Sequence, residues 1–429
     1  MNWRGRRQLI ISMLKKRQFA ELKKLVLRRL YINFIWRPVG FPLAIIIIPL
    51  LYFIEPFKRI RVGVIPTARI GHLTIEPELF LRRKKKGAAP FNQSNVETFF
   101  VTSRAVHKYE IANKQLLKMF KRNLRIFESY FASGVFFSIE WLLRKTRFVF
   151  GLPHDENFDS DDILQNSDTT LILTKEEEEK GNEFLRQIGF DIEKDWFACI
   201  FARDSVYLDK NFLNFDWSYH NWRDADIDTF IPAAEHIINN GGYAFRVGSC
   251  VEKKMAFQHE RFIDYAVRYR SDFLDIFLVA KCKFFLGTTS GICDVATAMN
   301  KPRIVTNCVP LGYVVQGKDC IYIPKKIKNK STGEYLSMSE ALQKGMDSQF
   351  EGNMFLGDQY EYQNNTSQEI LEVTKEMMAR LNGAFQIKEE DKRLMEKYYD
   401  LFKPKNMSYK IKNPPGLHFI RNYREVFFD

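Results

Sequence analysis

The sequence lacks the short motifs that would assign a nucleotide or metal site directly. It contains neither GxxxxGKS nor GxxxxGKT, which excludes a P-loop, and no GxGxxG follows the first expected strand. No HxxxH occurs, and Asp224-Ala225-Asp226 has the DxD form but opens an expected helix, where the helix dipole explains the acids. We therefore predict no catalytic metal and no cofactor.

Cysteine is sparse, and no low-complexity tract or short-period repeat is present. The six cysteines form no CxxC pair and no cluster in a chain of 429 residues. This pattern favours reduced, mostly buried thiols in a cytoplasmic protein over a disulfide framework. With 45% hydrophobic residues, the chain can form two ordinary α/β domains plus extensions.

Positive charge is in excess, but most of the excess lies at one end. The net charge is +13, and residues 1–38 hold eleven Lys or Arg and one acid. The remaining chain carries 54 basic and 51 acidic side chains. A nucleic-acid-binding body would carry its basic residues on the folded domain, so we predict no nucleic-acid partner.

The basic arm has the pattern of an amphipathic helix. Apolar residues recur at intervals of three and four, which gives one apolar stripe with lysines and arginines on other faces. Such a helix suits an anionic membrane surface, and the same pattern fits a helix docked on the protein's own core. The stripe consists of Phe19, Leu22, Val26, Leu30 and Phe34.

Residues 38–54 form a run of seventeen residues without a charge. Seventeen is the lower limit for a membrane-spanning helix, and Pro42 and Pro49 disfavour a straight span. Basic residues flank the run on both sides, so an interfacial or re-entrant insertion would keep both flanks on the cytoplasmic side. We predict that residues 1–58 hold the protein at the cytoplasmic face of the inner membrane, peripherally or monotopically. A buried core helix is the alternative.

The first α/β unit follows this run. Residues 59–66 predict a buried strand, residues 67–73 a Gly-containing loop, and Thr74 the start of a helix with acids in its first turn. Ligands bind at the carboxyl ends of such strands, so His72 is a candidate general base and Glu76 the second. A purely local hydrogen bond explains His72 equally well. Residues 168–173 (DTTLIL) predict another short strand.

Two arginines follow expected strands of a second α/β unit. Residues 196–202 form a continuous apolar run that ends in Arg203 and Asp204, and the strand at 243–247 ends near Arg246 and Gly248. A guanidinium binds phosphate oxygens in bidentate fashion and stays charged. We therefore assign these strand ends to a donor diphosphate.

A Gly-Thr-Thr-Ser-Gly loop lies between an expected strand at 282–286 and an expected helix at 292–299. Backbone amides and hydroxyls at a helix N-terminus form an anion site, although simple helix capping explains the same residues. Asp272 and Asp275 are candidates to bind ribose, base or sugar hydroxyls, or else cap their own helix. The loop residues assigned to the donor are Gly287, Thr288, Thr289, Ser290 and Gly291.

Blocks of the sequence resemble a bacterial family of glycosyltransferases from surface-polysaccharide gene clusters, over roughly residues 55 to 385. More distantly, the order of motifs is similar to O-fucosyltransferases and α1,6-fucosyltransferases, which implies an inverting, metal-independent, GT-B enzyme. The residue before Arg203 is not the family's histidine and Asp204 replaces a second arginine, so no donor nucleotide is assigned. The blocks are ARIGHL, ARDSVYL, YHNWRDADIDTFIPAAEHI, GGYAFRVGS and RSDFLDIFLVAKCKFFLGTTSG.

Together these features predict an α/β protein with two Rossmann-like lobes of the GT-B type and an N-terminal membrane-associated helical segment. Its expected activity is transfer of a sugar from a nucleotide-diphosphate sugar to a glycan or lipid-linked acceptor, with Arg203 also in the catalytic set. A nucleotide-sugar 2-epimerase and a non-enzymatic polysaccharide assembly protein remain alternatives. The expected units are the membrane segment 1–58, the acceptor domain 59–194, the donor domain 195–327 and a helical extension 328–429.

Overall fold

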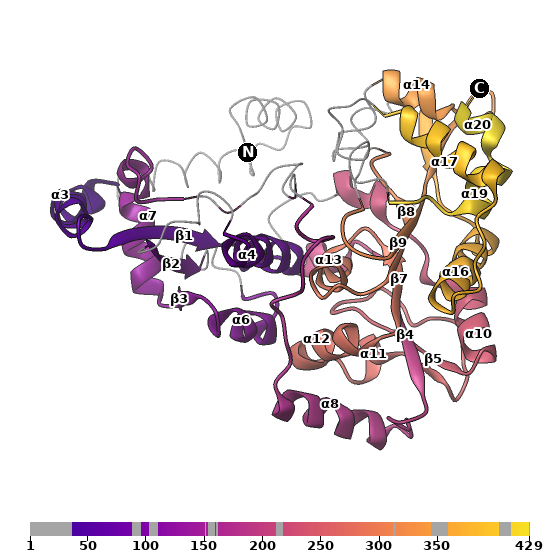
Figure 1. Cartoon of the computed structure of the whole chain (residues 1–429), viewed down its shortest axis with the longest axis horizontal. Helices are drawn as coiled ribbons and strands as arrows, with labels where there is room; N and C mark the ends of the chain where they lie inside the picture. Colours follow the sequence, from indigo (N-terminus) through magenta and orange to yellow (C-terminus); the bar gives the residue numbers. More distant parts are fainter. Residues whose placement is uncertain are drawn as a thin grey trace.

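The protein consists of two α/β lobes side by side, each built on a parallel sheet as predicted (Figure 1). The predicted amphipathic arm, residues 1–36, lies outside the described residues. The structure, a computed structural model, describes residues 37–87, 96–102, 110–150, 152, 159, 162–211, 218–311, 315–344, 359–402 and 413–428.

The N-terminal lobe contains a three-stranded parallel sheet in the order β1-β2-β3. The alternating run predicted as the first strand forms β1 (Arg59–Ile65), which pairs along its whole length with β2. The other elements of this lobe are β2 (Val96–Thr102), β3 (Arg125–Phe127), α3 (Arg37–Ile54), α4 (Ile70–Lys85), α6 (Lys114–Lys121) and α7 (Tyr130–Leu143).

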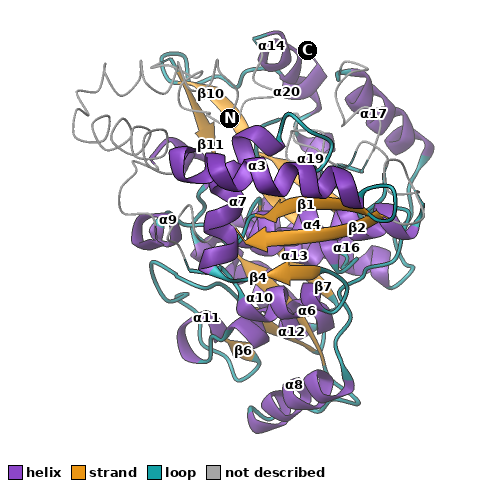
Figure 2. Cartoon of the chain, turned by 90° about the vertical axis from the view of Figure 1, so that its left-hand side faces the viewer, coloured by secondary structure: helices purple, strands orange, loops and turns teal. Residues whose placement is uncertain are grey.

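The uncharged run forms α3, a single helix that continues through Pro42 and Pro49. Ala44 is buried against α7, while the opposite face is exposed and apolar. Figure 1 shows α3 at the outer end of the N-terminal lobe, away from the C-terminal lobe, and Figure 2 shows it in front of β1 and β2, next to α7. Among the described helices, none combines the length and apolar character needed to cross a bilayer.

The C-terminal lobe contains a six-stranded parallel sheet in the order β6-β5-β4-β7-β8-β9. Its central strand is the apolar run predicted at 196–202, which is paired on both sides as a buried parallel strand requires. The strands are β4 (Trp196–Phe201), β5 (Gly242–Arg246), β6 (Phe262–Ile263), β7 (Phe284–Thr288), β8 (Arg303–Cys308) and β9 (Cys320–Pro324).

Helices cover both faces of this sheet. The helix α8 packs on α12, because Gly181 lies directly against the ring of Phe277, and so joins the C-terminal lobe although it precedes residue 195. A capping box between Thr174 and Glu177 starts α8, and the acids of its first turn favour the helix dipole. The helices are α8 (Lys175–Gln187), α9 (Val206–Asn211), η2 (Ser218–Arg223), η3 (Ile227–Phe230), α10 (Ile231–Asn239), α11 (Tyr265–Arg268), α12 (Asp272–Lys281) and α13 (Gly291–Ala298).

The extension after residue 327 contributes strands as well as the predicted helices. It packs on the C-terminal sheet, where the amide of Gly416 donates to the carbonyl of Tyr322 at 2.8 Å. Two short strands pair antiparallel beside the carboxyl edge of that sheet. The elements are β10 (Lys326–Asn329), α14 (Met338–Gln343), β11 (Tyr360–Gln363), α16 (Ser367–Leu381), α17 (Glu389–Asp400), α19 (Leu417–Asn422) and α20 (Arg424–Phe428).

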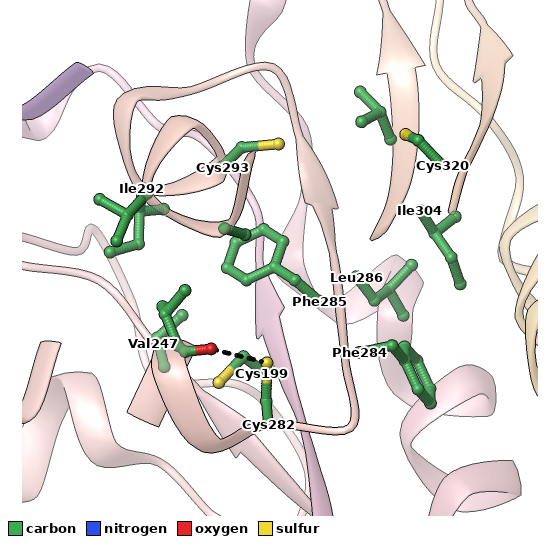
Figure 3. Close-up of a cluster of buried hydrophobic side chains, with 14 of the residues drawn as sticks. Cys199, Val247, Cys282, Phe284, Phe285, Leu286, Ile292, Cys293, Ile304 and Cys320 are labelled. Carbon is green, nitrogen blue, oxygen red and sulfur yellow. Dashed lines mark hydrogen bonds between the residues drawn. The ribbon is translucent and has the colours of Figure 1, made fainter. Parts of the chain in front are cut away.

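The core of the C-terminal lobe surrounds β7. Phe284, Phe285 and Leu286 are fully buried there, together with Cys199 and Cys282 (Figure 3). All six cysteines are free, and five of them are buried. The prediction of unbridged, mostly buried thiols is confirmed.

Arg82 joins the two lobes at the C-terminal ends of α4 and α13. Its buried guanidinium bonds to Glu78 at 2.7 Å, to the side chain of Asn300 at 3.0 Å and to the carbonyl oxygen of Ala298. The strand predicted at 168–173 does not form. Its Thr170 amide donates to Glu78 at 2.8 Å instead of to a neighbouring strand.

Candidate functional site

A cleft of about 870 Å³ opens over the carboxyl edge of the C-terminal sheet. The strands of this sheet are parallel, so the loops that follow them gather at one edge, where open α/β sheets bind their ligands. Segments from β4, β5, η2, β10 and β11 supply its walls. The lining residues are Ala202, Arg203, Asp204, Ser205, Asn221, Trp222, Asp224, Ala225, Asp226, Ile227, Arg246, Glu252, Lys253, Lys325, Lys330, Tyr360, Glu361, Tyr362 and Asn364.

Arg203 links this cleft to the Gly-Thr-Thr-Ser-Gly loop. Its backbone amide donates to the Thr288 hydroxyl at 3.0 Å, because β4 and β7 are neighbours and end together. Its guanidinium forms an ion pair with Asp224 on the cleft wall. The structure therefore brings the predicted Arg203 and Thr288 into direct contact.

Arg246 also lines the cleft, but its guanidinium has structural partners. It bonds to Asp264 at 3.1 Å and to the carbonyl oxygen of Lys253 at 3.1 Å, and the residue is 2% exposed. A guanidinium has five N–H donors, so these bonds leave some capacity for a ligand. Arg246 fixes the wall of the cleft at the end of β5.

Asp204 and Gly248 shape the loops around the cleft. The carboxylate of Asp204 accepts hydrogen bonds from the amides of Val206 at 3.2 Å and Glu252 at 3.0 Å, and so connects the loops after β4 and β5. Gly248 has a φ of +148°, a backbone conformation that residues other than glycine rarely adopt. Both predicted residues position the backbone of the loops around the cleft.

The Gly-Thr-Thr-Ser-Gly loop turns sharply from β7 into α13. Ser290 occupies the N-cap position, but its hydroxyl bonds to the carbonyl oxygen of Thr288 at 3.1 Å and makes no cap bond to the helix. Arg223 donates to the carbonyl oxygen of Thr289 at 3.1 Å and holds the outer side of the loop. The α13 amides are thus not capped by the Ser290 side chain, unlike those of a helix whose serine serves only as a cap.

The N-termini of α4 and α13 meet across the lobe boundary through two glycines. A Cβ on Gly291 would lie 2.7 Å from the amide nitrogen of Gly71, and a Cβ on Gly71 would lie 2.5 Å from the Asp294 carboxylate. Only residues without side chains allow this approach. A cavity of about 10 Å³ lies beside the contact and is lined in part by Ile75, Thr289, Ser290 and Asp294.

His72 lies at this contact, within α4 rather than in the loop that the sequence predicted. The helix begins at Ile70, four residues before the predicted start, and no acid lies in its first turn. The N-cap residue, Arg69, makes no side-chain cap bond, so the sequence carried no signal for this start. Because the helix already includes His72, Glu76 lies one turn after it on the same face of the helix.

His72 and Glu76 form a pair at the start of α4. His72 Nδ1 lies 2.9 Å from Glu76 Oε1; the histidine side chain is 43% exposed and that of the glutamate 7%. The carboxyl group of nearby Asp294 is enclosed by protein, which raises its pKa to about 6 against the opposing effect of Arg303 and His72. An exposed imidazole held by a buried carboxylate is the arrangement of an oriented general base.

Asp272 and Asp275 lie apart from this assembly, in the first turns of α12. Asp272 accepts from the amide of Lys114 at 2.8 Å, across the lobe boundary. Asp275 accepts from the Tyr265 hydroxyl at 2.9 Å and from Arg270 at 3.2 Å, and burial raises its pKa to about 6. Neither residue lines the cleft, so the structure does not bring them together with Arg203.

Several residues of the cleft could not be predicted from local sequence patterns. Trp222 stacks on Tyr362 with ring centroids 5.2 Å apart, and Lys325 projects into the cleft from the segment between β9 and β10. The polar and aromatic residues around Trp222 stand out in the sequence, but no sequence motif marks Lys325 or Tyr362 as residues of a binding site. In the described part of the chain, no group of three or more potential metal ligands is found.

No protein-family model and no curated protein matches the chain. Among solved structures, the E. coli ADP-heptose LPS heptosyltransferase II is similar, with 12% identity over 75% of this chain and 98% of its own, at a TM-score of 0.40. A glycosyl transferase family 9 structure from Veillonella parvula is 11% identical over the same shares, with a TM-score of 0.45. A UDP-N-acetylglucosamine 2-epimerase is 10% identical over 77% of this chain and 98% of its own, with a TM-score of 0.29. Similarity this low assigns no activity.

Proposed function

We propose that this protein is a GT-B glycosyltransferase, which moves a sugar from a nucleotide-diphosphate sugar to a glycan or lipid-linked acceptor in bacterial surface polysaccharide synthesis. The observation that carries the proposal is the contact of Gly71 with Gly291. It places a candidate base from one lobe beside the phosphate-loop candidate of the other. Two substrates held by two lobes suit a transfer reaction better than the isomerisation of one bound substrate.

The donor would lie in the cleft of the C-terminal lobe. Arg203 and the amides at the start of α13 would face its diphosphate, since both a guanidinium and a helix N-terminus favour phosphate oxygens. The aromatic wall formed by Trp222 and Tyr362 would lie along the nucleoside part. The volume of about 870 Å³ lies within the range of small-molecule sites.

The reaction would proceed with inversion at the anomeric carbon and without a divalent metal. His72 takes the proton from the acceptor hydroxyl while the acceptor oxygen bonds to the anomeric carbon and the bond to the diphosphate oxygen breaks. Glu76, bonded to Nδ1, favours the tautomer whose Nε2 carries the lone pair. The positive groups at Arg203 and α13 stabilise the departing diphosphate.

Nucleotide binding provides the first test, by thermal shift and calorimetry with UDP, GDP, ADP and CMP. The double change Thr289→Ala with Ser290→Ala should weaken binding of the preferred nucleoside diphosphate about tenfold with little loss of stability. Ser271→Ala is the matched control, because Ser271 caps α12 by accepting from the amide of Leu274. Its loss should cost about 1 kcal/mol of stability and leave affinity unchanged. Equal affinities in all three proteins would leave the loop without a donor role.

Product analysis separates the alternatives. A glycosyltransferase releases nucleoside diphosphate in proportion to glycosylated acceptor, and turnover should survive EDTA. Interconversion of the sugar within the free donor, without an acceptor, would instead identify a 2-epimerase. A folded protein that binds no nucleotide would leave the assembly-protein alternative.

We propose, in addition, that α3 holds the protein at the cytoplasmic face of the membrane as an interfacial element. An apolar, solvent-facing helix surface of this kind marks a site that meets a membrane or another protein, and we assign it to the membrane because the uncharged run of α3 follows the basic segment 1–37. The exposed residues of this face are Val39, Phe41, Pro42, Ile45, Ile46, Pro49, Leu50, Tyr52 and Phe53.

Vesicle flotation with phosphatidylglycerol and phosphatidylethanolamine tests this placement on the full chain. Ile46→Asp should reduce the floated fraction severalfold, since it puts a charge on the apolar face. Ile172→Asp is the control, because Ile172 is exposed to the same extent, 68% against 67%, but lies on another surface. Equal flotation of both variants, or no flotation of the unaltered chain, would contradict an interfacial α3.

A further inference from the structure

Two consecutive lysines between β9 and β10 are buried in different surroundings. Lys326 bonds to the carboxylate of Glu369 at 2.6 Å and to the Tyr423 hydroxyl at 2.8 Å, so its charge is neutralised within the fold. Lys325 turns the other way, into the cleft of the C-terminal lobe. The two ammonium groups therefore differ in what balances their charge.

The Lys325 ammonium is held by backbone carbonyls alone. It donates to the carbonyl oxygens of Trp222 at 2.7 Å and Asp224 at 2.9 Å, and the residue is 3% exposed. Within the described residues, no carboxylate forms an ion pair with it. An ammonium has three N–H donors, and two carbonyls leave the third for a ligand in the cleft.

The groups next to the Lys325 ammonium carry a net positive charge. The carboxylate of Asp224 forms its ion pair with Arg203, while only the backbone carbonyl of Asp224 bonds to Lys325, so these three side chains hold two cations and one anion. Burial and the nearby Arg203 charge lower the Lys325 pKa to about 7. An anion placed between the two cations would oppose that shift, because it favours the charged ammonium.

We propose that Lys325 is a second cationic ligand for the donor diphosphate, and that it acts beside Arg203 from the wall of the cleft. This inference rests on the proposed function. Lys325 would then favour ligands that carry a diphosphate. The carbonyl oxygens of Trp222 in η2 and of Asp224 just after it hold the Lys325 ammonium in place for this contact. A nucleoside without phosphates would gain nothing from this contact.

Calorimetric titration with inorganic pyrophosphate and with nucleoside 5′-diphosphates tests the assignment on the full chain. Lys325→Gln should weaken pyrophosphate and nucleoside diphosphate binding by about tenfold or more, and leave the affinity for the nucleoside alone unchanged. Lys325→Arg keeps the charge and should recover part of the loss. If Lys325 had only a structural role, Lys325→Gln would weaken the binding of nucleoside diphosphate and of nucleoside equally, and Lys325→Arg would not restore diphosphate binding.

Lys326→Met is the matched control, one residue away. It removes the partner of buried Glu369 and should lower the melting temperature without changing pyrophosphate affinity. Equal pyrophosphate affinity in the wild type and Lys325→Gln overturns the inference but leaves the proposed function standing. Absence of binding of pyrophosphate and of every nucleoside diphosphate to the wild type overturns both.

Discussion

The two ends of the contact between α4 and α13 carry opposite charges for the same physical reason. The helices run parallel, since Gly71 meets Gly291 at one end and Arg82 reaches Ala298 at the other. Parallel helices bring like ends of their dipoles together. The enclosed carboxyl group of Asp294 lies where the positive ends meet, and the buried guanidinium of Arg82 lies where the negative ends meet.

The difference lies in how completely each end is satisfied. Arg82 has five bonded partners from both lobes and the intervening segment, so that end is fixed. At the other end lie glycines, an exposed imidazole and a carboxyl group with a raised pKa. Fully bonded groups stabilise a fold, whereas partly satisfied ionisable groups are typical of sites where chemistry occurs.

The largest effect is expected from removal of the Arg82 charge. Arg82→Met leaves the buried Glu78 carboxylate without its cationic partner and should lower the free energy of unfolding by about 3–5 kcal/mol. Urea denaturation measures the change. Glu78→Gln in the same chain should recover part of the loss, and the exposed Lys85→Met should have almost no effect. A stable Arg82→Met variant would show that the lobes do not depend on this end.

The next effect concerns the opposite end and appears in activity rather than stability. His72→Gln should lower kcat by about 10²–10⁴-fold, the range for general-base catalysis, and leave nucleoside diphosphate affinity unchanged. Glu76→Gln should cause a smaller loss of kcat, because the amide side chain still contacts the imidazole but orients it less firmly. Unchanged kcat in His72→Gln would remove it as the base.

The glycine contact gives a matched pair of smaller changes. Gly291→Ala drives a methyl against the backbone of Gly71 and should cost about 1–3 kcal/mol while it separates the lobes and lowers turnover. Gly71→Ala meets the movable end of the Asp294 side chain and should cost less. Differential scanning calorimetry and turnover of both variants measure the two effects. Equal tolerance of both changes would indicate that the contact is loose.

The smallest effect is a pH dependence at Asp294. Its pKa is raised from 3.8 to about 6, so the folded protein binds a proton that the unfolded chain releases between these values. Stability contributed by this group is present below pH 4 and is lost as the pH rises through 6. The wild type should therefore lose about 1–2 kcal/mol relative to Asp294→Asn between pH 4 and pH 7. Parallel stability curves for the two proteins would show that the carboxyl group titrates normally.

The sequence predicted the elements that depend on local pattern. The continuous apolar run at 196–202 predicted a buried central strand, because both faces of such a strand lie against other elements. The start of α4 could not be predicted, because the contact with α13, two hundred residues away, stabilises a helix that Gly71 would disfavour by itself. Residues 168–173 failed as a strand because Glu78 binds the amide that a strand would have used.

The candidate site was predicted in part for the same reason. Arg203 and Thr288 lie at the ends of neighbouring strands, so the parallel topology of the C-terminal sheet brings them to one edge. His72 follows β1 of the other sheet and reaches them only through the contact of α4 with α13. Asp272 and Asp275 also lie in a first helical turn, where a ligand could bind. Asp272 instead accepts from the amide of Lys114 in the other lobe, and Asp275 accepts from Arg270. Lys325 could not be found, since the carbonyls that hold it come from residues one hundred positions earlier in the chain.

Because the Arg82 end of the lobe contact is fixed, a small rotation of one lobe about that end would move the glycine end much further. Arg82 and Gly71 are eleven residues apart, which is about 16 Å along a helix. A rotation of about 10° around the Arg82 end would separate the glycines by about 3 Å, close to the van der Waals diameter of one oxygen atom. The cavity at the contact now has room for about one water molecule. A rotation of this size would be enough to admit a phosphate oxygen between the helix ends.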